Sequence, residues 1–397
     1  FRHCCLLSSD SPGKHTMKIV IAPDSFKESL SAMQVATAIE QGFREIYPDA
    51  QYVKLPMADG GEGTVESMVE ATEGHYHFID VTGPLGTPVQ ARWGMLGDGK
   101  TAVIEMAAAS GLHHVPPEHR NPLLTTSYGT GELILAALDR GVEHIILGIG
   151  GSATNDGGAG MLQALGIDLL DEKGDALPEG GGALSKLATI DTSHADPRLK
   201  TVSITVACDV NNPLCGPTGA SAIFGPQKGA TEAMVAALDG ALAVYGKRLQ
   251  EFTGRDVMNA PGAGAAGGMG AALLGLLGAD LKPGVEIVIN ALQLERLVAD
   301  ASLVITGEGR LDSQSICGKT PIGVARCAKR YQKPVIALAG GLTQDHQIVH
   351  EHGLDAVFSV LTRIATLPEA LEDAEYNLRI SARNIASVWK LSQQQIH

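Results

Sequence analysis

The 397-residue chain carries 44% apolar and 19% charged side chains, a composition typical of a packed protein long enough for two domains. Its formal net charge of −14 argues against binding of nucleic acid, because phosphate backbones require clustered Lys and Arg. The six cysteines form no CxxC pair and no apolar run is long enough to span a bilayer, so we expect no zinc or disulfide framework, no membrane partner and a reducing, cytoplasmic location.

The first segment that looks folded begins at Met17. Residues 1–16 contain an apolar stretch too short for a signal peptide, followed by Ser, Pro and Gly, so we expect a disordered leader or extension there. A strand is expected over 19–22, and Asp24 and Lys27 follow it in the loop before the next helix. A carboxylate and a lysine in the first strand-to-helix loop of an α/β sheet favour a role in ligand binding.

The second expected strand, 52–56, also runs into a glycine turn that carries two carboxylates, Asp59 and Glu62. Carboxylate oxygens suit Mg2+, so these two residues are the candidate metal ligands. Asp59 is equally a candidate for contacting substrate hydroxyls, together with Gly60 and Gly61, whose backbone can approach a ligand closely.

From about residue 81 the pattern changes, and apolar and polar residues alternate over 89–105. Within this stretch Gly94–Thr101 matches the P-loop pattern letter by letter, but a P-loop needs a buried strand before it and a helix after it. Asp98-Gly99 between two alternating runs instead predicts a β-hairpin. An antiparallel hairpin inside an α/β chain marks an inserted second domain.

A polar glycine loop follows the strand expected over 144–150. Its candidates for binding a substrate or a phosphate are Ser152, Asn155 and Asp156. Gly148–Ala153 also matches the dinucleotide fingerprint GxGxxA, which keeps open an NAD-dependent oxidoreductase of 2-hydroxy acids. We favour the polar ligand, because the fingerprint helix should begin at the third small residue and here the loop continues.

Two later loops are less specific. Lys228 precedes a long predicted helix and is a candidate phosphate contact, although we expect a solvated lysine there. Gly264 and Gly267 lie in a run of small residues before an apolar helix. Their glycines either let backbone amides contact a nucleotide or permit close helix packing, and both interpretations stay open.

The α/β alternation returns after residue 288, with strands expected at 303–306, 335–339 and 356–359 and a closing helix over 370–391. We expect a doubly wound parallel sheet of the flavodoxin or Rossmann type, made discontinuously from 17–80 and 288–397. A large α/β domain, 81–287, is inserted into it, with a cleft between the two. The strand over 303–306 is expected to end in a charged glycine turn, 307–312.

Together these segments resemble the bacterial glycerate 2-kinase family. The segments that carry the resemblance are Met17–Ser31, Ala58–Thr64, Gly97–Leu112, Gly148–Gly158, Pro261–Leu273 and Leu303–Ala325. The resemblance implies a flavodoxin-like domain interrupted by a second α/β domain, and phosphorylation of D-glycerate by ATP with Mg2+ to give 2-phosphoglycerate. Formation of 3-phosphoglycerate and a non-catalytic nucleotide-binding protein remain alternatives. The sequence indicates no oligomeric state.

Phosphoryl transfer requires charge neutralisation around the phosphates and a carboxylate that orients or deprotonates the accepting hydroxyl. We assign neutralisation to Lys27, Arg310 and Lys319. The carboxylate is expected to be Asp312, with Asp24 as the second choice. Backbone contacts to the nucleotide are expected at Gly307, Gly309, Gly264 and Gly267.

Overall fold

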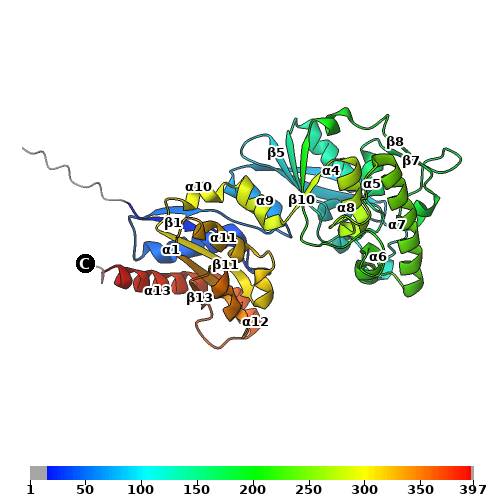
Figure 1. Ribbon diagram of the computed structural model, residues 1–397. Coiled ribbons are helices and arrows are strands. Elements are labelled where there is room, and N and C mark those ends of the chain that lie inside the picture. The colour runs from blue at the N-terminus through cyan, green and yellow to red at the C-terminus, as the bar shows by residue number, and fades with distance from the viewer. Residues whose placement is uncertain (1–15, 395–397) are drawn as a thin grey trace, which may run out of the picture.

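The chain forms two lobes, each built around one β-sheet and joined near its middle (Figure 1). This structure is a computed structural model that describes residues 16–394. The leader predicted over 1–16 lies outside the described residues except for Thr16.

The first lobe contains a five-stranded parallel sheet in the order β13-β12-β11-β1-β2. Counted along this lobe, the order is 2-1-3-4-5, the flavodoxin-like arrangement, which confirms the predicted fold class. The strands are β1 (Lys18–Ile21), β2 (Gln51–Lys54), β11 (Leu303–Leu311), β12 (Val335–Leu342) and β13 (Ala356–Ser359). The central strands are buried on both faces, as expected for apolar runs in a parallel sheet.

Helices cover both faces of this sheet. On one face α1 (Ala32–Arg44) and α13 (Ala374–Gln394) pack against each other. Ser31 starts α1 through a capping box with Gln34, and its apolar residues recur at helical spacing. The other face carries α9 (Gly284–Ala291), α10 (Leu294–Val298) and α11 (Thr320–Lys329).

The second lobe contains a six-stranded mixed sheet in the order β10-β9-β6-β5-β4-β3. Its strands are β3 (His75–Thr82), β4 (Pro88–Met95), β5 (Thr101–Glu105), β6 (His144–Gly148), β9 (Ser203–Ala207) and β10 (Asp280–Lys282). A small hairpin, β7 (Asp168–Leu170) and β8 (Thr189–Asp191), lies apart. The helices are α2 (Thr64–Ala71), α3 (Ala107–Ser110), α4 (Tyr128–Asp139), α5 (Ala159–Ala164), α6 (Ala220–Phe224), α7 (Glu232–Thr253) and α8 (Ala265–Leu276).

The P-loop match is a hairpin, as predicted. β4 and β5 pair antiparallel, and the Asp98 carboxylate accepts hydrogen bonds from the backbone N–H groups of Lys100 and Thr101 in the turn between them. A strand follows this turn where a P-loop would require a helix.

The second lobe begins earlier in the chain than the boundary predicted at residue 81, where the pattern of apolar and polar residues changes. β3 begins at His75, six residues before the expected change at 81, and pairs with β4 throughout. The preceding helix α2 packs on β4 and β5 of the second sheet. We therefore propose that the inserted domain begins near residue 64, at α2, and ends near residue 283, between β10 and α9, in place of the boundaries at 81 and 287 proposed from the sequence.

Two predicted elements are wrong in detail. The charged segment 307–312 is not a turn, because β11 continues to Leu311 in parallel pairing with β12, with Gly307 opposite Leu338 and Arg310 opposite Gly341. A Cβ on Gly307 would lie 2.3 Å from the Leu338 carbonyl oxygen, so this glycine permits close strand pairing. The closing helix is broken at Asp373, between α12 (Leu367–Glu372) and α13.

Candidate functional site

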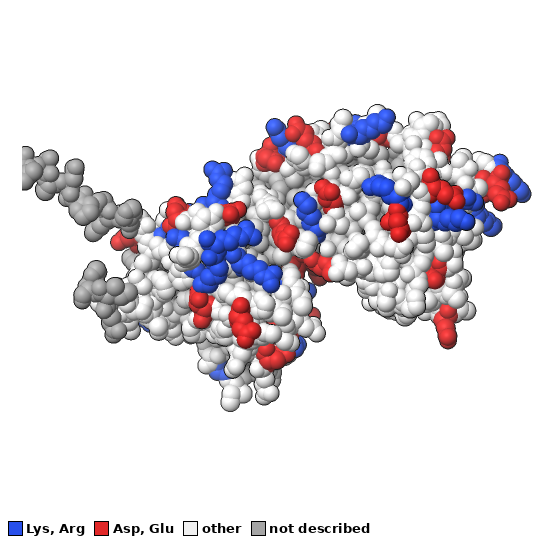
Figure 2. All heavy atoms as spheres, in the orientation of Figure 1, with Lys and Arg blue, Asp and Glu red and all other residues white. Residues whose placement is uncertain are grey.

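The carboxyl ends of both sheets face a crevice between the lobes. β1, β2 and β11 bring their terminal loops to it from the first lobe, and β6 and β9 from the second. The crevice contains a large cavity of about 570 Å³ and a small cavity of about 370 Å³. Lys27, Asp59 and Gly61 line both, so the two cavities adjoin. This is where open α/β sheets bind ligands. On the face in Figure 2, Lys and Arg gather over α11, whereas acidic side chains lie where the molecule narrows between the lobes.

Asp24 forms the polar floor of the large cavity. Its Oδ1 accepts a hydrogen bond of 2.7 Å from the Ser25 backbone N–H, and its Oδ2 accepts one of 2.6 Å from the Thr320 hydroxyl at the start of α11. Burial, and then the nearby Asp59 carboxylate, raise the pKa of Asp24 to about 6. Such a group is ionised at neutral pH yet able to take up a proton.

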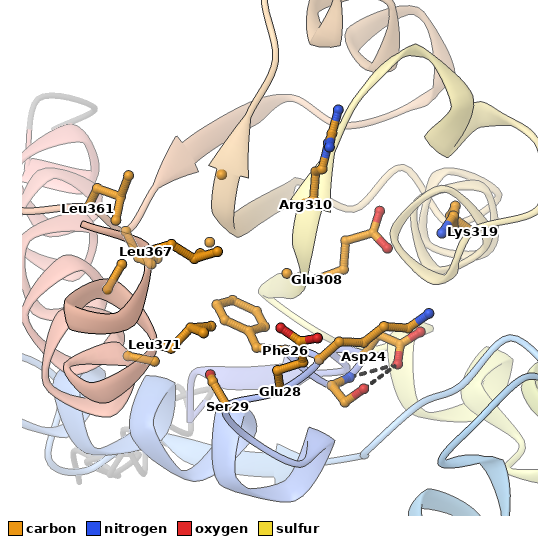
Figure 3. A pocket seen from close by; sticks show the side chains of 18 of the residues that line it. Asp24, Phe26, Glu28, Ser29, Glu308, Arg310, Lys319, Leu361, Leu367 and Leu371 are labelled. Atoms are coloured by element: carbon orange, nitrogen blue, oxygen red, sulfur yellow. Dashed lines mark hydrogen bonds between the residues drawn. The ribbon is translucent and has the colours of Figure 1, made fainter. Parts of the chain in front are cut away.

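Glu308 is a second carboxyl group in this cavity, and it was not singled out from the sequence. Its side chain points toward the same side as Lys319 and Asp24 (Figure 3). It is 7% exposed, and its Oε1 is buried with no hydrogen-bond partner among the described residues. Burial raises its pKa to about 7, opposed by Lys319 and reinforced by Asp24 and Asp59. The sequence could have indicated Glu308, because it lies between Gly307 and Gly309, both of which were predicted to contact the nucleotide.

The opposite wall of the large cavity is apolar. Phe26 lies on it with Leu361, Leu367 and Leu371, which come from α12 and the loop before it (Figure 3). An apolar wall facing a charged floor is typical of a site for a ligand with one flat hydrophobic part and one charged part.

The small cavity contains a buried lysine. Lys228 is 2% exposed, and its ammonium group donates hydrogen bonds of 2.9 Å to the Ser152 hydroxyl and 2.7 Å to the Thr154 carbonyl oxygen. Burial lowers its pKa to about 7. The expectation of a solvated lysine is therefore wrong: the turn Pro226–Lys228 places the side chain beneath the 152–154 loop, a long-range contact that local sequence does not reveal.

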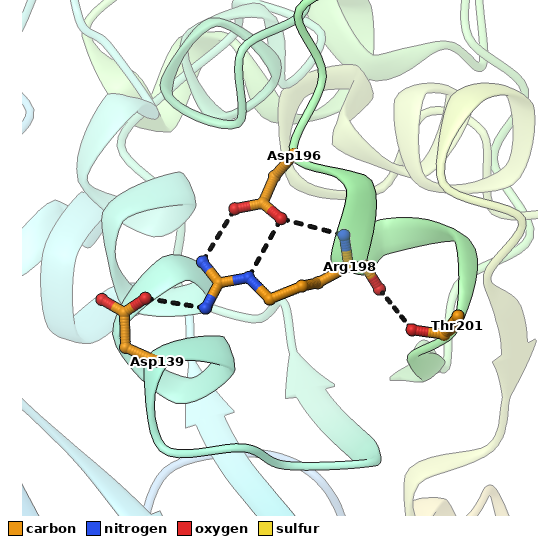
Figure 4. A network of polar contacts seen from close by, with 4 residues as sticks. All are labelled: Asp139, Asp196, Arg198 and Thr201. Carbon is orange, nitrogen blue, oxygen red and sulfur yellow. Dashed lines mark hydrogen bonds and ion pairs between the residues drawn. The ribbon is translucent and has the colours of Figure 1, made fainter.

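Asp209 reaches the small cavity from the end of β9. Its Oδ1 accepts a hydrogen bond of 3.1 Å from the Gly284 backbone N–H, and burial, followed by Asp59 and Glu286, raises its pKa. A network of ion pairs holds the segment just before β9. Arg198 donates hydrogen bonds to both oxygens of Asp196 and to Asp139 on α4, which ties the start of the strand to a neighbouring helix (Figure 4).

Many of the predicted site residues do meet in the crevice. Those that line the large cavity are Asp24, Lys27, Asp59, Gly61, Glu62, Gly309, Arg310 and Lys319. Those that line the small cavity are Lys27, Asp59, Gly60, Gly61 and Ser152. Residues separated by more than 250 positions in the chain thus share one site.

Asp312, the expected catalytic carboxylate, lies outside both cavities. It caps the short helix Ser313–Ile316, accepting from the Gln314 N–H at 2.9 Å, and pairs with Arg310 Nε at 3.3 Å. Its oxygens are thus committed to local structure.

Of the three residues predicted in the polar glycine loop, one lines a cavity and two are buried within the loop. Only Ser152 lines a cavity. Asp156 is fully buried and accepts hydrogen bonds from Ser127, Gly158 and Gly160, and burial raises its pKa. Asn155 is also fully buried and donates to the Ser221 hydroxyl. Asp156 and Asn155 therefore shape the loop that carries Ser152.

Of the glycines predicted to contact a nucleotide, one lines the large cavity and the others are closely packed against neighbouring backbone. Gly309 lines the large cavity. A Cβ on Gly264 would lie 2.2 Å from the Pro213 carbonyl oxygen, and one on Gly267 would lie 1.9 Å from that of Thr154. The structure therefore favours the packing interpretation for both, as it does for Gly307.

A divalent cation fits the floor of the crevice. Asp59 raises the pKa of Asp24, Asp209 and Glu308, so mutual repulsion among carboxylates is unrelieved there. The orphaned Glu308 Oε1 supplies a buried ligand atom. Among residues 16–394, the one group that holds three potential ligand atoms within 4.8 Å of one another is elsewhere, at Asp168, Asp191 and His194, so the crevice is not a preassembled metal cage.

The dinucleotide fingerprint is not formed. β6 ends at Gly148 and α5 begins only at Ala159, whereas the fingerprint places the helix start at its third small residue, here Ala153. The Ala153 N–H donates to the Ser110 carbonyl oxygen and belongs to the loop. This geometry removes the basis for the NAD-dependent alternative.

The chain is similar to known proteins over nearly its whole length. A model of the glycerate kinase family matches residues 19–390. The chain is 64% identical to the glycerate 2-kinase of Escherichia coli K12, over 94% of this chain and 97% of that protein. It is 60% identical to the glycerate kinase of Haemophilus influenzae Rd, over 94% and 98%. A crystal structure assigned to glycerate kinase 2 of Salmonella typhimurium LT2 superposes with a TM-score of 0.89 at 62% identity, covering 96% of this chain and all of that one.

Proposed function

This chain belongs to the glycerate kinase family, and we propose that its crevice transfers the γ-phosphoryl group of ATP to the 2-hydroxyl group of D-glycerate, giving 2-phosphoglycerate. The observation that carries the proposal is the meeting of two unlike cavities at Lys27 and Asp59. One cavity combines an apolar wall with a charged floor, and the other is small and polar. A donor and a small acceptor held in adjoining cavities satisfy the positioning that phosphoryl transfer requires.

ATP is assigned to the large cavity. The apolar wall at Phe26, Leu367 and Leu371 would pack on the adenine base, and the triphosphate would lie over the polar floor. Lys27, Lys319 and Arg310 line this cavity and would balance phosphate charge. Five acidic side chains line the same cavity, namely Asp24, Glu28, Asp59, Glu62 and Glu308, so the three cations alone do not make it positive, and an anionic donor would also need a metal cation there.

We assign Mg2+ to the carboxylates of Asp59 and Glu308, with Glu62 nearby in the same cavity. When bound, the ion neutralises the phosphates of the donor. Burial raises the pKa of Glu308 to about 7, so without a cation this carboxyl group would be partly protonated at neutral pH. A bound cation would favour its ionised form and would give its unpartnered Oε1 a ligand.

Asp24 is our candidate for the carboxylate that orients and deprotonates the glycerate hydroxyl. It lines the large cavity together with Asp59 and Lys27, and these two residues also line the small cavity. The Thr320 hydroxyl fixes Oδ2, and the Ser25 N–H fixes Oδ1. A pKa of about 6 leaves Asp24 ionised at neutral pH, as a general base must be.

We also propose a cytoplasmic location. Among the described residues Cys208, Cys215, Cys317 and Cys327 are free thiols, the state that a reducing compartment maintains.

The direct test is product identification. The purified protein is incubated with ATP, Mg2+ and D-glycerate, and the product is identified by 31P and 1H NMR. We expect 2-phosphoglycerate and stoichiometric ADP. Formation of 3-phosphoglycerate would retain the kinase and change the acceptor hydroxyl. Thermal stabilisation by ATP without ADP formation would instead support a nucleotide-binding protein without catalysis.

A further inference from the structure

Lys228 is a buried amine that has no anionic hydrogen-bond partner among residues 16–394. Among residues 16–394 its two hydrogen-bond acceptors are neutral oxygens, the Ser152 hydroxyl and the Thr154 carbonyl. An ammonium group carries three N–H donors, so one remains after these two bonds. A buried charge destabilises a fold unless it is paired.

The carboxylate that acts on Lys228 does not neutralise it directly. Asp156 is the one charged group that influences its protonation, and the oxygens of Asp156 accept hydrogen bonds from Ser127, Gly158 and Gly160. Asp156 therefore stabilises the loop through these hydrogen bonds and does not pair with Lys228. Lys228 lines the small cavity together with Ser152.

The surroundings of the small cavity indicate where an anion would lie. Gly150, Gly151 and Ser152 line it beside Lys228, whereas Asp59 and Asp209 line it from the ends of β2 and β9. Lys228 attracts an anion and the two aspartates repel it. The negative group of a ligand would therefore lie at the Lys228 end of the small cavity.

We propose that Lys228 binds the carboxylate of glycerate and thereby selects a carboxylic acid over a neutral polyol. The proposal rests on the proposed function, because it names how the acceptor of that reaction is recognised. Binding at Lys228 would leave the hydroxyl groups of the three-carbon acid directed toward Lys27 and Asp59, the residues shared with the large cavity. Lys228 is thus a specificity residue that touches the substrate away from the reacting oxygen.

The principal test is the Lys228→Met variant, which keeps the length of the side chain and removes its charge. We expect the KM for D-glycerate to rise by about 10- to 100-fold, as for loss of a charged hydrogen bond, with the KM for ATP nearly unchanged. Lys173, which is exposed in a surface turn, provides the matched Lys→Met control and should leave both KM values unchanged. The ratio of kcat/KM for D-glycerate to that for glyceramide, its uncharged analogue, should fall in Lys228→Met.

Thermal unfolding separates this role from a merely structural one. Without ligands Lys228→Met should melt at a higher temperature than the wild type, because the variant no longer has to bury an ammonium group or deprotonate it on folding. D-glycerate should raise the Tm of the wild type and not that of Lys228→Met, whereas ATP should raise both.

Two results would overturn the inference. An unchanged KM for D-glycerate in Lys228→Met would exclude carboxylate binding, and a lowered Tm with the glycerate-induced shift retained would assign Lys228 to the architecture of the 152–154 loop. Both leave the kinase intact, so they differ from failure of the proposed function, in which the wild type itself forms no phosphoglycerate.

Discussion

Asp24 and Asp312 illustrate how the same residue type takes different roles in one molecule. Both were candidates because each follows a strand of the parallel sheet. The structure gives Asp24 a place in the cavity and a raised pKa, and gives Asp312 a helix to cap and an ion pair with Arg310. Both carboxylates accept hydrogen bonds, but only Asp24 lines the cavity, so Asp24 is the one placed to receive a proton from a substrate bound there.

The comparison of Asp24→Asn with Asp312→Asn tests this assignment. Loss of a general base typically lowers kcat by about 10² to 10⁴-fold, and we expect a loss in this range for Asp24→Asn with the KM for ATP preserved. Asp312→Asn should lose less, through the local effect of its weakened cap. Steady-state kinetics on variants with verified folding give the answer, and the reverse order of losses would return the role to Asp312.

The pH dependence of the reaction follows from the same carboxylate. Its pKa of about 6 means that Asp24 becomes protonated as the pH falls below 6, so the base is progressively lost in acid. We expect kcat/KM for D-glycerate to decline about tenfold per pH unit below that point. Initial rates between pH 5 and 8.5 would show the limb, and it should be missing from the residual activity of Asp24→Asn. A wild-type profile that stays flat down to pH 5 would contradict the assignment.

At the scale of elements, the loop between β2 and α2 brings the lobes together. Gly60 has φ +92°, and a Cβ there would lie 2.7 Å from the Cβ of Ala207, at the end of β9 in the second lobe, and 3.0 Å from the Cα of Gly284, at the start of α9. A Cβ on Gly284 would in turn lie 1.9 Å from the Asp59 carbonyl oxygen. The position of Asp59 in the site therefore depends on two glycines that allow direct backbone contact.

Gly60→Ala should be costly for two reasons, and Gly99→Ala separates them. Gly99, in the β4–β5 turn, also has positive φ, +67°, but nothing lies within 4 Å of its added Cβ. Gly99→Ala should therefore lose only the backbone term, about 1 to 2 kcal/mol, whereas Gly60→Ala should lose a further 1 to 3 kcal/mol from steric overlap. Urea denaturation measures both. Equal losses would mean that the loop adapts and that the contact is not restrictive.

Elements also decide what the sequence could predict. The strand-end motifs at Asp24 and Asp59 were recognisable because parallel strands deliver their terminal loops to one edge, a rule that needs only chain order. The continuation of β11 through Gly307 to Leu311 was missed because glycines and charges usually mark turns, and here pairing with β12 overrides that local preference. Lys228 could not be predicted as buried, since its environment comes from the 152–154 loop more than 70 residues away.

At the scale of the whole molecule, one apolar cluster spans the two lobes, beside a separate cluster in each lobe. A continuous cluster includes Val20 and Val304 of the first sheet, Val103 and Ile146 of the second, and Met68 of α2 between them. An interface of this kind couples folding units, whereas polar contacts would leave them independent. We therefore expect the lobes to unfold together although they are separate in shape (Figure 1).

The two tryptophans make cooperative unfolding directly measurable. Trp93 is buried in the second lobe and Trp389 lies on α13 of the first, so Trp389→Phe and Trp93→Phe each leave a reporter for one lobe. In each variant the urea midpoint from fluorescence should coincide with that from far-UV circular dichroism, because a two-state transition moves every probe together. Adding Met68→Ala, which removes a fully buried side chain from the shared cluster, should lower both midpoints in parallel, by about 2 to 5 kcal/mol of unfolding free energy. If the midpoint moved for only one tryptophan, the lobes would be independent folding units. Ligand binding across the crevice would then include the entropy lost in fixing their relative positions.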